Sequence, residues 1–490
     1  MNLIDARSPR QVAWWTVCLL AVGCQASSLA DPPTVMAMAT APPAAPPIVI
    51  GRADAIPLRS IATDPLPLTP AFSQDVEDYC IRCRAGANAV NVTVTDMQGV
   101  ESTPITLVED QTVNVRGLYR IRCLPHDFPA ITVGYPTLGS VPTPGYYLVN
   151  SLTYAMALDV RGTPVWYARG PQVMNVDSVA TNTISYMPLG IGPFGHDDNN
   201  HFEIHQLDAS TLTSLVAVGT PTDFHEFLLL PNGNHMIFAY FIETDVDLTG
   251  LGTYGPGQTI GDPVVQEIDP SGVVVWSWRA IDHLDPATES LEPLAFFING
   301  VTVVDVFHFN SIDVDASDNL LISARHTNSI YYVDRETGKV QWKLGGTSAN
   351  KDGAQSIQIV NDPQGTFSMQ HDARFTPNGD ITLFDDHGAS PGVARGVEYE
   401  LDLAANTATM VFQTLGTVPA QAEGSFRRYP DGHSVIGWGL SKNDPRVFTE
   451  VDALGNDVMD VGLGGKDSYR AVKVRLSQLD IGVLRATTAK

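Results

Sequence analysis

The sequence predicts an all-β protein, a six-bladed β-propeller preceded by a small β-sandwich domain, on three observations. Short apolar runs rich in Leu, Ile, Val and Tyr are cut by turn residues at hairpin spacing, and no helical periodicity separates them. A closing segment of Asp, Gly and an aromatic residue recurs along the chain, and so does an opening hairpin turn. One polar position also recurs, eight residues before those turns.

The closing segment has three strong copies and one weaker copy, at Asp159/Gly162/Trp166, Asp269/Gly272/Trp276, Asp334/Gly338/Trp342 and Asp452/Gly455/Met459. The opening turns lie at 231–234, 318–319, 377–380 and 430–433. Four-stranded units that recur about 40 to 60 residues apart are typical of a propeller. The spacing predicts blades at about 145–170, 172–220, 222–281, 300–346, 367–414 and 422–465. Residues 468–477 could close the ring, and a seventh blade within 172–220 is the alternative.

The recurring polar position carries His225, Asn310 and His371. The innermost strands of a propeller line a central channel, so equivalent positions on these strands converge. His308 lies two residues before Asn310, and on a strand both side chains point the same way. Arg325 ends the second strand of that hairpin, which returns it to the same mouth of the channel. The register therefore predicts one polar site built from several blades.

Residues 1–24 carry basic residues followed by a short apolar stretch, the pattern of a secretory signal peptide. The end of this segment is similar to a bacterial lipobox, in which Cys24 would be lipidated; ordinary cleavage after Ala30 is the alternative. Residues 25–70 are rich in Pro and Ala, which predicts an extended linker. We therefore expect the protein outside the cytoplasm, in the periplasm or at the cell surface, with a lipid anchor in the membrane.

Residues 71–142 alternate polar and apolar side chains, which predicts the small β-sandwich domain before the propeller at 143–480. Cys83 and Cys123 each follow an arginine at the end of a strand run, which favours a disulfide between them with Cys80 left over. A Cys80–Cys83 pair would be the redox alternative, but no thioredoxin-like βαβ pattern surrounds it.

The formal net charge of -25 argues against nucleic acid as a partner, because a phosphate backbone requires a basic surface. In so acidic a chain, a cluster of three histidines, one asparagine and one arginine would be a local site for an anion.

Five motifs occur in one order within residues 145–465: His225 in Asp-Phe-His-Glu, His308-Phe-Asn310, Ser323-Ala-Arg325, Thr337-Gly338 with Trp342, and Gln370-His371-Asp. Together they resemble the bacterial arylsulfate sulfotransferase (arylsulfotransferase, ASST) family. The resemblance implies a six-bladed propeller with a small N-terminal β domain and an active site at the channel. It also implies transfer of a sulfuryl group from an aryl sulfate donor to a phenolic acceptor, without a nucleotide donor or a cofactor.

The matching motifs also imply roles. His371 would be the nucleophile that becomes sulfated, which splits one displacement into two easier steps. His225 would move protons at the phenolic oxygens. The sulfuryl oxygens would be bound by His308, Asn310 and Arg325.

Two features depart from the expected pattern. Asp372 directly follows His371, and Asp386-His387 stands where a plainer turn is expected, which could alter the pocket or add a histidine. Arg325 could instead pair with Asp386, at the equivalent position one blade on.

Two other function classes compete with the transferase. Convergent histidines could ligate a transition metal, although an arginine beside a cation is unfavourable. The propeller could also be a binding module without chemistry. The sequence leaves open the physiological donor and acceptor, the acceptor-binding residues and the oligomeric state, a homodimer included.

Overall fold

The computed structural model describes residues 46–51, 57–188, 192, 196–197, 199–388 and 392–488. The predicted signal peptide and Cys24 lie outside these residues. No helix in the described part of the chain is long and apolar enough to cross a membrane.

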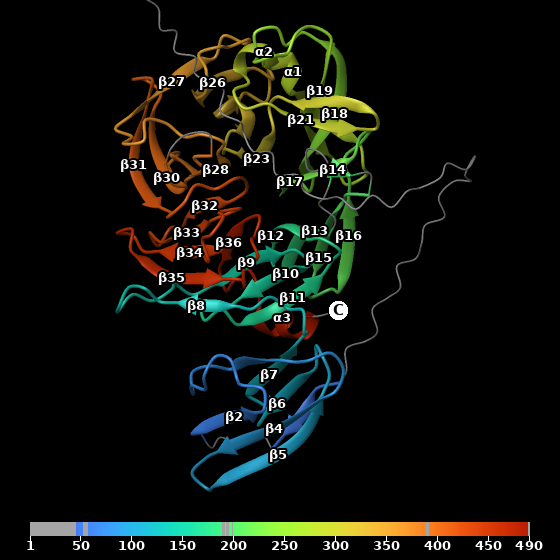
Figure 1. Ribbon diagram of the computed structural model, residues 1–490, viewed down its shortest axis with the longest axis vertical. Coiled ribbons are helices and arrows are strands. Elements are labelled where there is room, and N and C mark those ends of the chain that lie inside the picture. The colour runs from blue at the N-terminus through green and yellow to red at the C-terminus, as the bar shows by residue number, and fades with distance from the viewer. Residues whose placement is uncertain are drawn as a thin grey trace, which may run out of the picture. The chain divides into compact units, whose positions relative to one another are not determined.

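The N-terminal domain is a β-sandwich of two sheets (Figure 1). One sheet has the order β1 (Ile48–Ile50), β6 (Thr112–Val115), β7 (Tyr119–Leu124) and β3 (Asp78–Arg82). The other has the order β2 (Ser60–Asp64), β4 (Asn88–Thr95) and β5 (Val100–Leu107). Alternate residues of β4, Val90, Val92 and Val94, are buried against the facing sheet. The alternation seen in the sequence therefore forms the core of this domain.

The domain begins earlier than the sequence indicated. Strands β1 and β2 lie within the range expected to be an extended linker, 25–70. The apolar triplet of β1 pairs in parallel with β6, and Ile61 of β2 is buried in the sandwich core. The Pro-rich composition hid these strands, because a three-residue strand is too short to show a period.

The disulfide between Cys83 and Cys123 is confirmed, and Cys80 is a buried free thiol. The structure thus excludes the Cys80–Cys83 pair. Burial raises the pKa of the Cys80 thiol to about 12, so this thiol stays protonated and unreactive.

The second domain is a propeller whose described residues form six four-stranded blades, as predicted. Blade 1 contains β9 (Tyr146–Ser151), β10 (Tyr154–Leu158), β11 (Pro164–Arg169) and β36 (Ala471–Val474). Blade 2 contains β12 (Met174–Ala180), β13 (Thr183–Met187), β15 (Phe202–Gln206) and β16 (Thr211–Leu215). Blade 3 contains β17 (Thr222–Leu229), β18 (His235–Val246), β19 (Gln258–Ile268) and β20 (Val274–Arg279).

The last three blades follow in chain order. Blade 4 contains β23 (Phe309–Val314), β24 (Leu320–Ala324), β25 (Ser329–Val333) and β26 (Val340–Gly345). Blade 5 contains β28 (His371–Phe375), β29 (Ile381–Asp385), β30 (Arg395–Asp402) and β31 (Thr407–Leu415). Blade 6 contains β32 (Ser425–Arg428), β33 (Ser434–Gly437), β34 (Phe448–Val451) and β35 (Asp457–Gly462).

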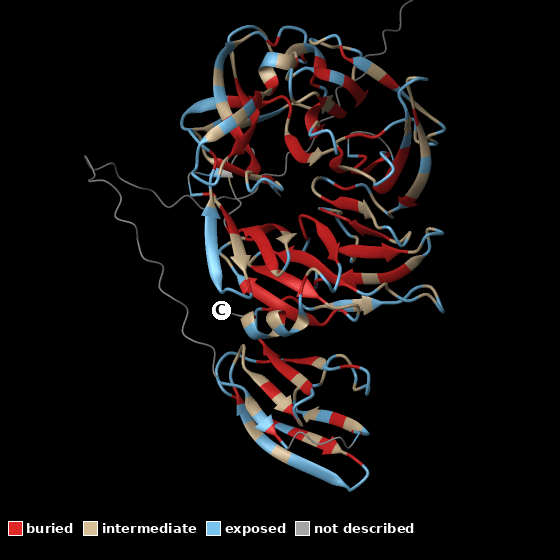
Figure 2. Cartoon of the chain, turned by 180° about the vertical axis from the view of Figure 1, so that it is seen from behind, coloured by how far each residue is buried: buried red, intermediate tan, exposed pale blue. Residues whose placement is uncertain are grey.

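Short elements extend these sheets. The additional strands are β8 (Thr132–Gly134), β14 (His196–Asp197), β21 (Leu294–Ile298), β22 (Val301–Asp305) and β27 (Gln355–Val360). The helices are α1 (Ala280–His283), α2 (Pro286–Glu289), the 3-10 helix η2 (Arg325–Thr327) and α3 (Ile481–Thr487). Figure 2 shows that the buried residues follow the strands of both domains.

The repeated turns have a common chemistry. Asp159 Oδ1 accepts the backbone N–H groups of Arg161 and Thr163, both at 2.8 Å, and Gly162 adopts a φ of 74° that favours glycine. Asp269 and Gly272 repeat this turn between β19 and β20. The Asp-to-Gly pattern in the sequence therefore marks the hairpin between the two outer strands of a blade.

The chain closes the ring with its C-terminal strand. β36 pairs antiparallel with β9, the first propeller strand, which confirms the prediction for 468–477. The innermost strands β12, β17, β23, β28, β32 and β36 each contact the next around the ring. Side chains at the starts of these strands therefore meet around one axis.

Candidate active site

The five predicted site residues come from three neighbouring blades. His225, Asn310 and His371 lie on the inner strands β17, β23 and β28, and all three are buried. His308 precedes β23, and its ring centroid lies 4.7 Å from that of His225. Arg325 begins η2, where its backbone N–H donates to His308 O at 2.8 Å. The hairpin thus returns Arg325 to the end of the channel where His308 lies.

Each of the three imidazoles has a carboxylate at Nδ1. The Nδ1 of His225 lies 2.8 Å from Asp223 Oδ1, and that of His308 lies 2.6 Å from Asp305 Oδ2. The Nδ1 of His371 lies 3.1 Å from Asp386 Oδ1. A carboxylate at Nδ1 fixes the ring and leaves Nε2 for chemistry.

The hydrogen bonds of His371 define its tautomer. The backbone N–H of Glu423 donates to Nε2 at 3.2 Å, so Nε2 carries a lone pair. Nδ1 therefore holds the proton and donates it toward Asp386 Oδ1 or Met369 O. The electron pair of Nε2 is thus available for nucleophilic chemistry once the hydrogen bond from Glu423 is displaced.

Electrostatics favour this neutral form. Burial lowers the pKa of His371 well below its usual range, and Arg325, His308 and His225 lower it further. Burial also raises the pKa of the Asp386 carboxyl well above its usual range. An uncharged His371 is therefore the resting state at neutral pH.

His308 is also neutral at rest. Burial lowers its pKa to about 3, although Asp305 opposes that shift. Burial disfavours ionisation of Asp305, but His326 and His308 outweigh it and lower the pKa of this carboxyl. A bound anion would act in the opposite sense on His308 and raise its pKa.

Arg325 and Asn310 have unsatisfied polar atoms. Arg325 donates from Nη1 to His326 Nε2 and from Nη2 to Gln421 O, both at 2.8 Å, while its Nε has no partner among the described residues. It also forms no ion pair with Asp386 within that part of the chain. Asn310 Nδ2 donates to Gln370 O at 2.7 Å, which fixes the orientation of the amide, and Oδ1 has no partner there.

Further buried polar atoms without a described partner surround these residues. They are Asp305 Oδ1, Gln370 Oε1 and Asp386 Oδ2. Most buried polar groups in proteins are hydrogen-bonded, so a concentration of orphans indicates a place for a polar ligand or water.

Backbone strain is concentrated at the same place. The residues His308, Met369, Asp372 and Glu423 adopt φ values of 54°, 55°, 53° and 71°, in the left-handed region. Such conformations cost on the order of 1–3 kcal/mol each and cluster at functional sites. The backbone of Glu423 packs closely on Gly439. A Cβ at position 439 would lie 2.7 Å from the Glu423 carbonyl carbon, so a larger residue there would displace Glu423. The backbone of Glu423 is therefore held against His371 Nε2.

A network of ion pairs lies on the inner strands that carry the histidines. Arg470 pairs with Glu226 at 3.1 Å and with Asp372 at 3.3 Å, and it donates to Asn310 O at 2.7 Å. Asp372 also pairs with Arg374 and Arg427. Asp372, one of the two departures from the expected pattern, thus belongs to this network. The other histidine, His387, lies against Asp385 with 3.4 Å between Nδ1 and Oδ2.

One group of described side chains near the histidines consists of residue types that commonly bind metal ions. The potential ligand atoms of Asp305, His308 and His326 lie within 4.8 Å of one another. However, His326 Nδ1 donates to Asp305 O at 2.9 Å, and its Nε2 accepts from Arg325 Nη1. Both ring nitrogens are occupied, and a guanidinium lies beside the ring. The donor set therefore fits a metal cation poorly.

Several residues of this site were missed from the sequence. Asp223 and Asp305 stand two and three residues before their histidines, a signal that could have been used. Glu423 stands next to Gly424, which occupies the repeated polar position in blade 6. His326 carries no comparable signal beyond its place after Arg325.

Solved structures with some likeness to this chain have low identity. A protein of unknown function from Bacteroides caccae is 13% identical, covering 68% of this chain and 100% of its own, with a TM-score of 0.42. A putative 6-phosphogluconolactonase from Bacteroides fragilis is 11% identical, covering 69% and 99%, with a TM-score of 0.37. At these values the likenesses carry no functional information. Among curated proteins, no match was found.

The sequence profile described as "Arylsulfotransferase (ASST)" matches residues 170–464. The matched range holds all five predicted site residues and spans more than half of the 490 residues. The chain therefore belongs to the arylsulfotransferase family, which supports an arylsulfotransferase activity in general.

Proposed function

We propose that the protein transfers a sulfuryl group from an aryl sulfate ester to a phenolic acceptor in two steps, through sulfated His371. The observation that carries this proposal is the state of His371: a buried neutral imidazole whose Nε2 lone pair accepts from the Glu423 N–H, and whose pKa is lowered by Arg325, His308 and His225. A neutral imidazole is a competent nucleophile, and cations nearby favour an anionic donor.

In the first step, His371 Nε2 attacks sulfur and the bond between sulfur and the phenolic oxygen breaks. The leaving phenolate takes a proton from Nε2 of His225, whose Nδ1 is held by Asp223. The imidazolium formed on sulfation keeps its proton at Nδ1, which donates to Asp386 Oδ1.

In the second step, the acceptor phenol gives its proton to His225 Nε2 as its oxygen attacks sulfur. The bond between His371 Nε2 and sulfur breaks, which restores the neutral imidazole. His225 therefore ends each cycle in the protonation state in which it began.

Arg325 Nε and the second N–H of Asn310 Nδ2 are donors available for the sulfuryl oxygens. His308 can also donate from Nε2 once it is protonated, and the negative charge of the donor raises its pKa toward that state. We accordingly expect donor binding to be accompanied by proton uptake.

The test uses the purified mature protein and 4-nitrophenyl sulfate. Release of nitrophenol beyond one equivalent per protein should require added phenol, and phenyl sulfate should form in equal amount to this further release. Metal chelation before the assay should leave the rate unchanged. Loss of activity on chelation, with recovery on adding one metal, would instead support a metal at Asp305, His308 and His326. No turnover with any aryl sulfate and phenol would leave the binding module as the explanation.

We also propose that the protein is extracytoplasmic and anchored through lipidated Cys24. The Cys83–Cys123 disulfide supports this, because such bonds form in oxidising compartments. Cys24→Ser should abolish fatty-acid labelling and release the protein from membranes. Retention of label in that variant would contradict the anchor.

A further inference from the structure

A second cluster of arginines lies far along the chain from the histidines, on strand β7 of the N-terminal domain. Arg120 and Arg122 are two residues apart and therefore share the face of the sheet turned away from the sandwich core. Across the strand pair, Asn114 and Thr112 stand opposite them on β6. This face is polar, while Ile121 and Cys123 between them are buried in the core.

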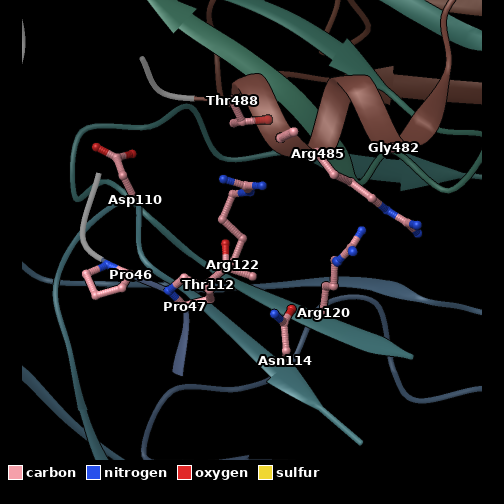
Figure 3. Close-up of a pocket in the computed structure, with 11 residues that line it drawn as sticks. Pro46, Pro47, Asp110, Thr112, Asn114, Arg120, Arg122, Gly482, Arg485 and Thr488 are labelled. Atoms are coloured by element: carbon pink, nitrogen blue, oxygen red, sulfur yellow. The ribbon is translucent and has the colours of Figure 1, made fainter. Parts of the chain in front are cut away.

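A pocket covers this polar face (Figure 3). Its volume is about 330 Å³, and α3 lines its other side with Gly482, Arg485 and Ala486, followed by Thr488. Figure 3 shows the side chains of Arg120, Arg122 and Arg485 extending into the space between the strands and the helix. Three guanidinium groups from two elements thus share one pocket.

Two of these guanidinium groups lack partners. Arg122 is only 9% exposed, yet its side chain forms no hydrogen bond or ion pair with any residue in the described ranges. Its one aromatic contact is distant, with Cζ 5.8 Å from the centre of the Tyr167 ring. Nη1 of Arg120 is buried and also without a described partner. An unpaired buried guanidinium is costly, so these residues require a counter-charge.

The neighbouring carboxylates are already engaged. Arg485 pairs with Asp78 and with Glu77, the latter at 2.9 Å. Asp110, on the pocket wall, accepts a hydrogen bond from Tyr167 at 2.6 Å and forms no ion pair within the described residues. The described part of the chain therefore supplies no ion pair for Arg122, although the sequence carries 54 acidic residues.

We infer that this pocket binds a small oxyanion of the sulfate or phosphate class, held by Arg122 and Arg120 of β7 and by Arg485 of α3. Guanidinium groups match the geometry of such oxygens through paired N–H donors. Donors on two sides of the pocket suit a multivalent anion better than a single carboxylate. The ligand would tie the N-terminal domain to the C-terminal helix of the chain. This inference concerns a site separate from the histidines and is independent of the proposed function.

The test measures binding of sodium sulfate and of sodium phosphate to the mature protein by calorimetry, in chloride buffer of matched ionic strength. Arg122→Gln should weaken binding at the pocket at least tenfold, whereas Arg325→Gln should leave it intact. Asp110→Asn should strengthen binding, because it removes a repulsive charge but keeps a hydrogen-bond acceptor for Tyr167. Arg122→Lys keeps the positive charge but lacks the paired N–H donors of a guanidinium. Its affinity for the anion should lie between those of the wild type and Arg122→Gln.

Two readouts keep the result interpretable. Arg122→Gln should retain its circular dichroism spectrum and its turnover of 4-nitrophenyl sulfate, which shows that it folds. Vesicles of phosphatidylglycerol test a lipid headgroup as the source of the phosphate, with phosphatidylcholine vesicles as control. Binding to the anionic vesicles alone, lost in Arg122→Gln, would support the same chemistry with a lipid source. Equal anion binding by wild type and Arg122→Gln, or no binding of any of these probes, would overturn the inference.

Discussion

Buried arginines occur in both domains, and their neighbours differ sharply. In the propeller channel, Arg470 is matched by Glu226 and Asp372, and Arg374 by the same two acids. On β7, Arg122 is nearly as buried but forms no ion pair with a described acid. The arginines of the channel are thus paired within the fold, whereas the described residues give Arg122 no counter-charge. Arg325 resembles Arg122 in one respect, since it also forms no ion pair in the described structure and has a free Nε.

The comparison predicts unequal effects on stability. Arg470→Met should lower the free energy of unfolding by about 3 kcal/mol, because it removes one of the cations that pair with the buried Glu226 and Asp372. Arg122→Gln in chloride buffer should change the same quantity by less than about 1 kcal/mol. Urea titration of both variants checks this. Equal losses in the two variants would show that Arg122 is paired after all.

Arg325→Lys should lower kcat/KM by roughly 10²–10³, because a lysine cannot replace the guanidinium that positions donors for the sulfuryl oxygens. Its free energy of unfolding should stay near that of the wild type. Arg428→Lys, on the inner strand β32 but paired with Glu398, is the matched control and should leave kcat/KM unchanged. A similar loss in both variants would assign the effect to packing of the propeller.

His225→Gln should lower the single-turnover rate of His371 sulfation by about 10² or more with phenyl sulfate, whose leaving group needs a proton. With 4-nitrophenyl sulfate this rate should fall much less, because nitrophenolate leaves without protonation. Asp223→Asn should show the same dependence on leaving group with a smaller loss. A uniform effect on all donors would place His225 in binding and not in proton transfer.

The smallest expected effect concerns pH. Burial, reinforced by Asp467, raises the pKa of Glu423 to about 8. Its carboxyl group is therefore neutral below pH 8 and negative above, where it would repel an anionic donor. The KM for the donor should rise a few-fold above that pH, and Glu423→Gln should remove the rise. Acidification through the ordinary histidine range should not protonate His371, because its pKa is lowered. Chromatographic product analysis avoids the pH dependence of nitrophenol absorbance.

Much of the fold could be predicted because four of the six blades repeat the same turn chemistry in the sequence. The Asp159 and Gly162 turn recurs in later blades, and counting back from the opening turns gave the register of His225, Asn310 and His371. Strand β1 could not be found in this way, since three residues in a Pro-rich segment show no period.

The rest of the site depends on how segments meet in space. The N–H of Glu423 reaches His371 across 52 positions of sequence, and only the ring of blades brings the two together. Likewise, alternation along β7 indicates that Arg122 faces away from the sandwich core, but not that α3 lines the pocket it faces. Whether a charged side chain has a partner depends on the folded structure and cannot be read from the sequence.

The most direct test of the account is the mass of the intact protein after mixing with 4-nitrophenyl sulfate in the absence of an acceptor. The spectrum should be recorded at neutral pH, because sulfated imidazole hydrolyses in acid. The account predicts a gain of one sulfuryl group on the wild type and on Arg122→Gln, none on His371→Asn, and loss of the gain when phenol is added. An equal gain on His371→Asn, or phenol-dependent turnover without any adduct on the wild type, would contradict it.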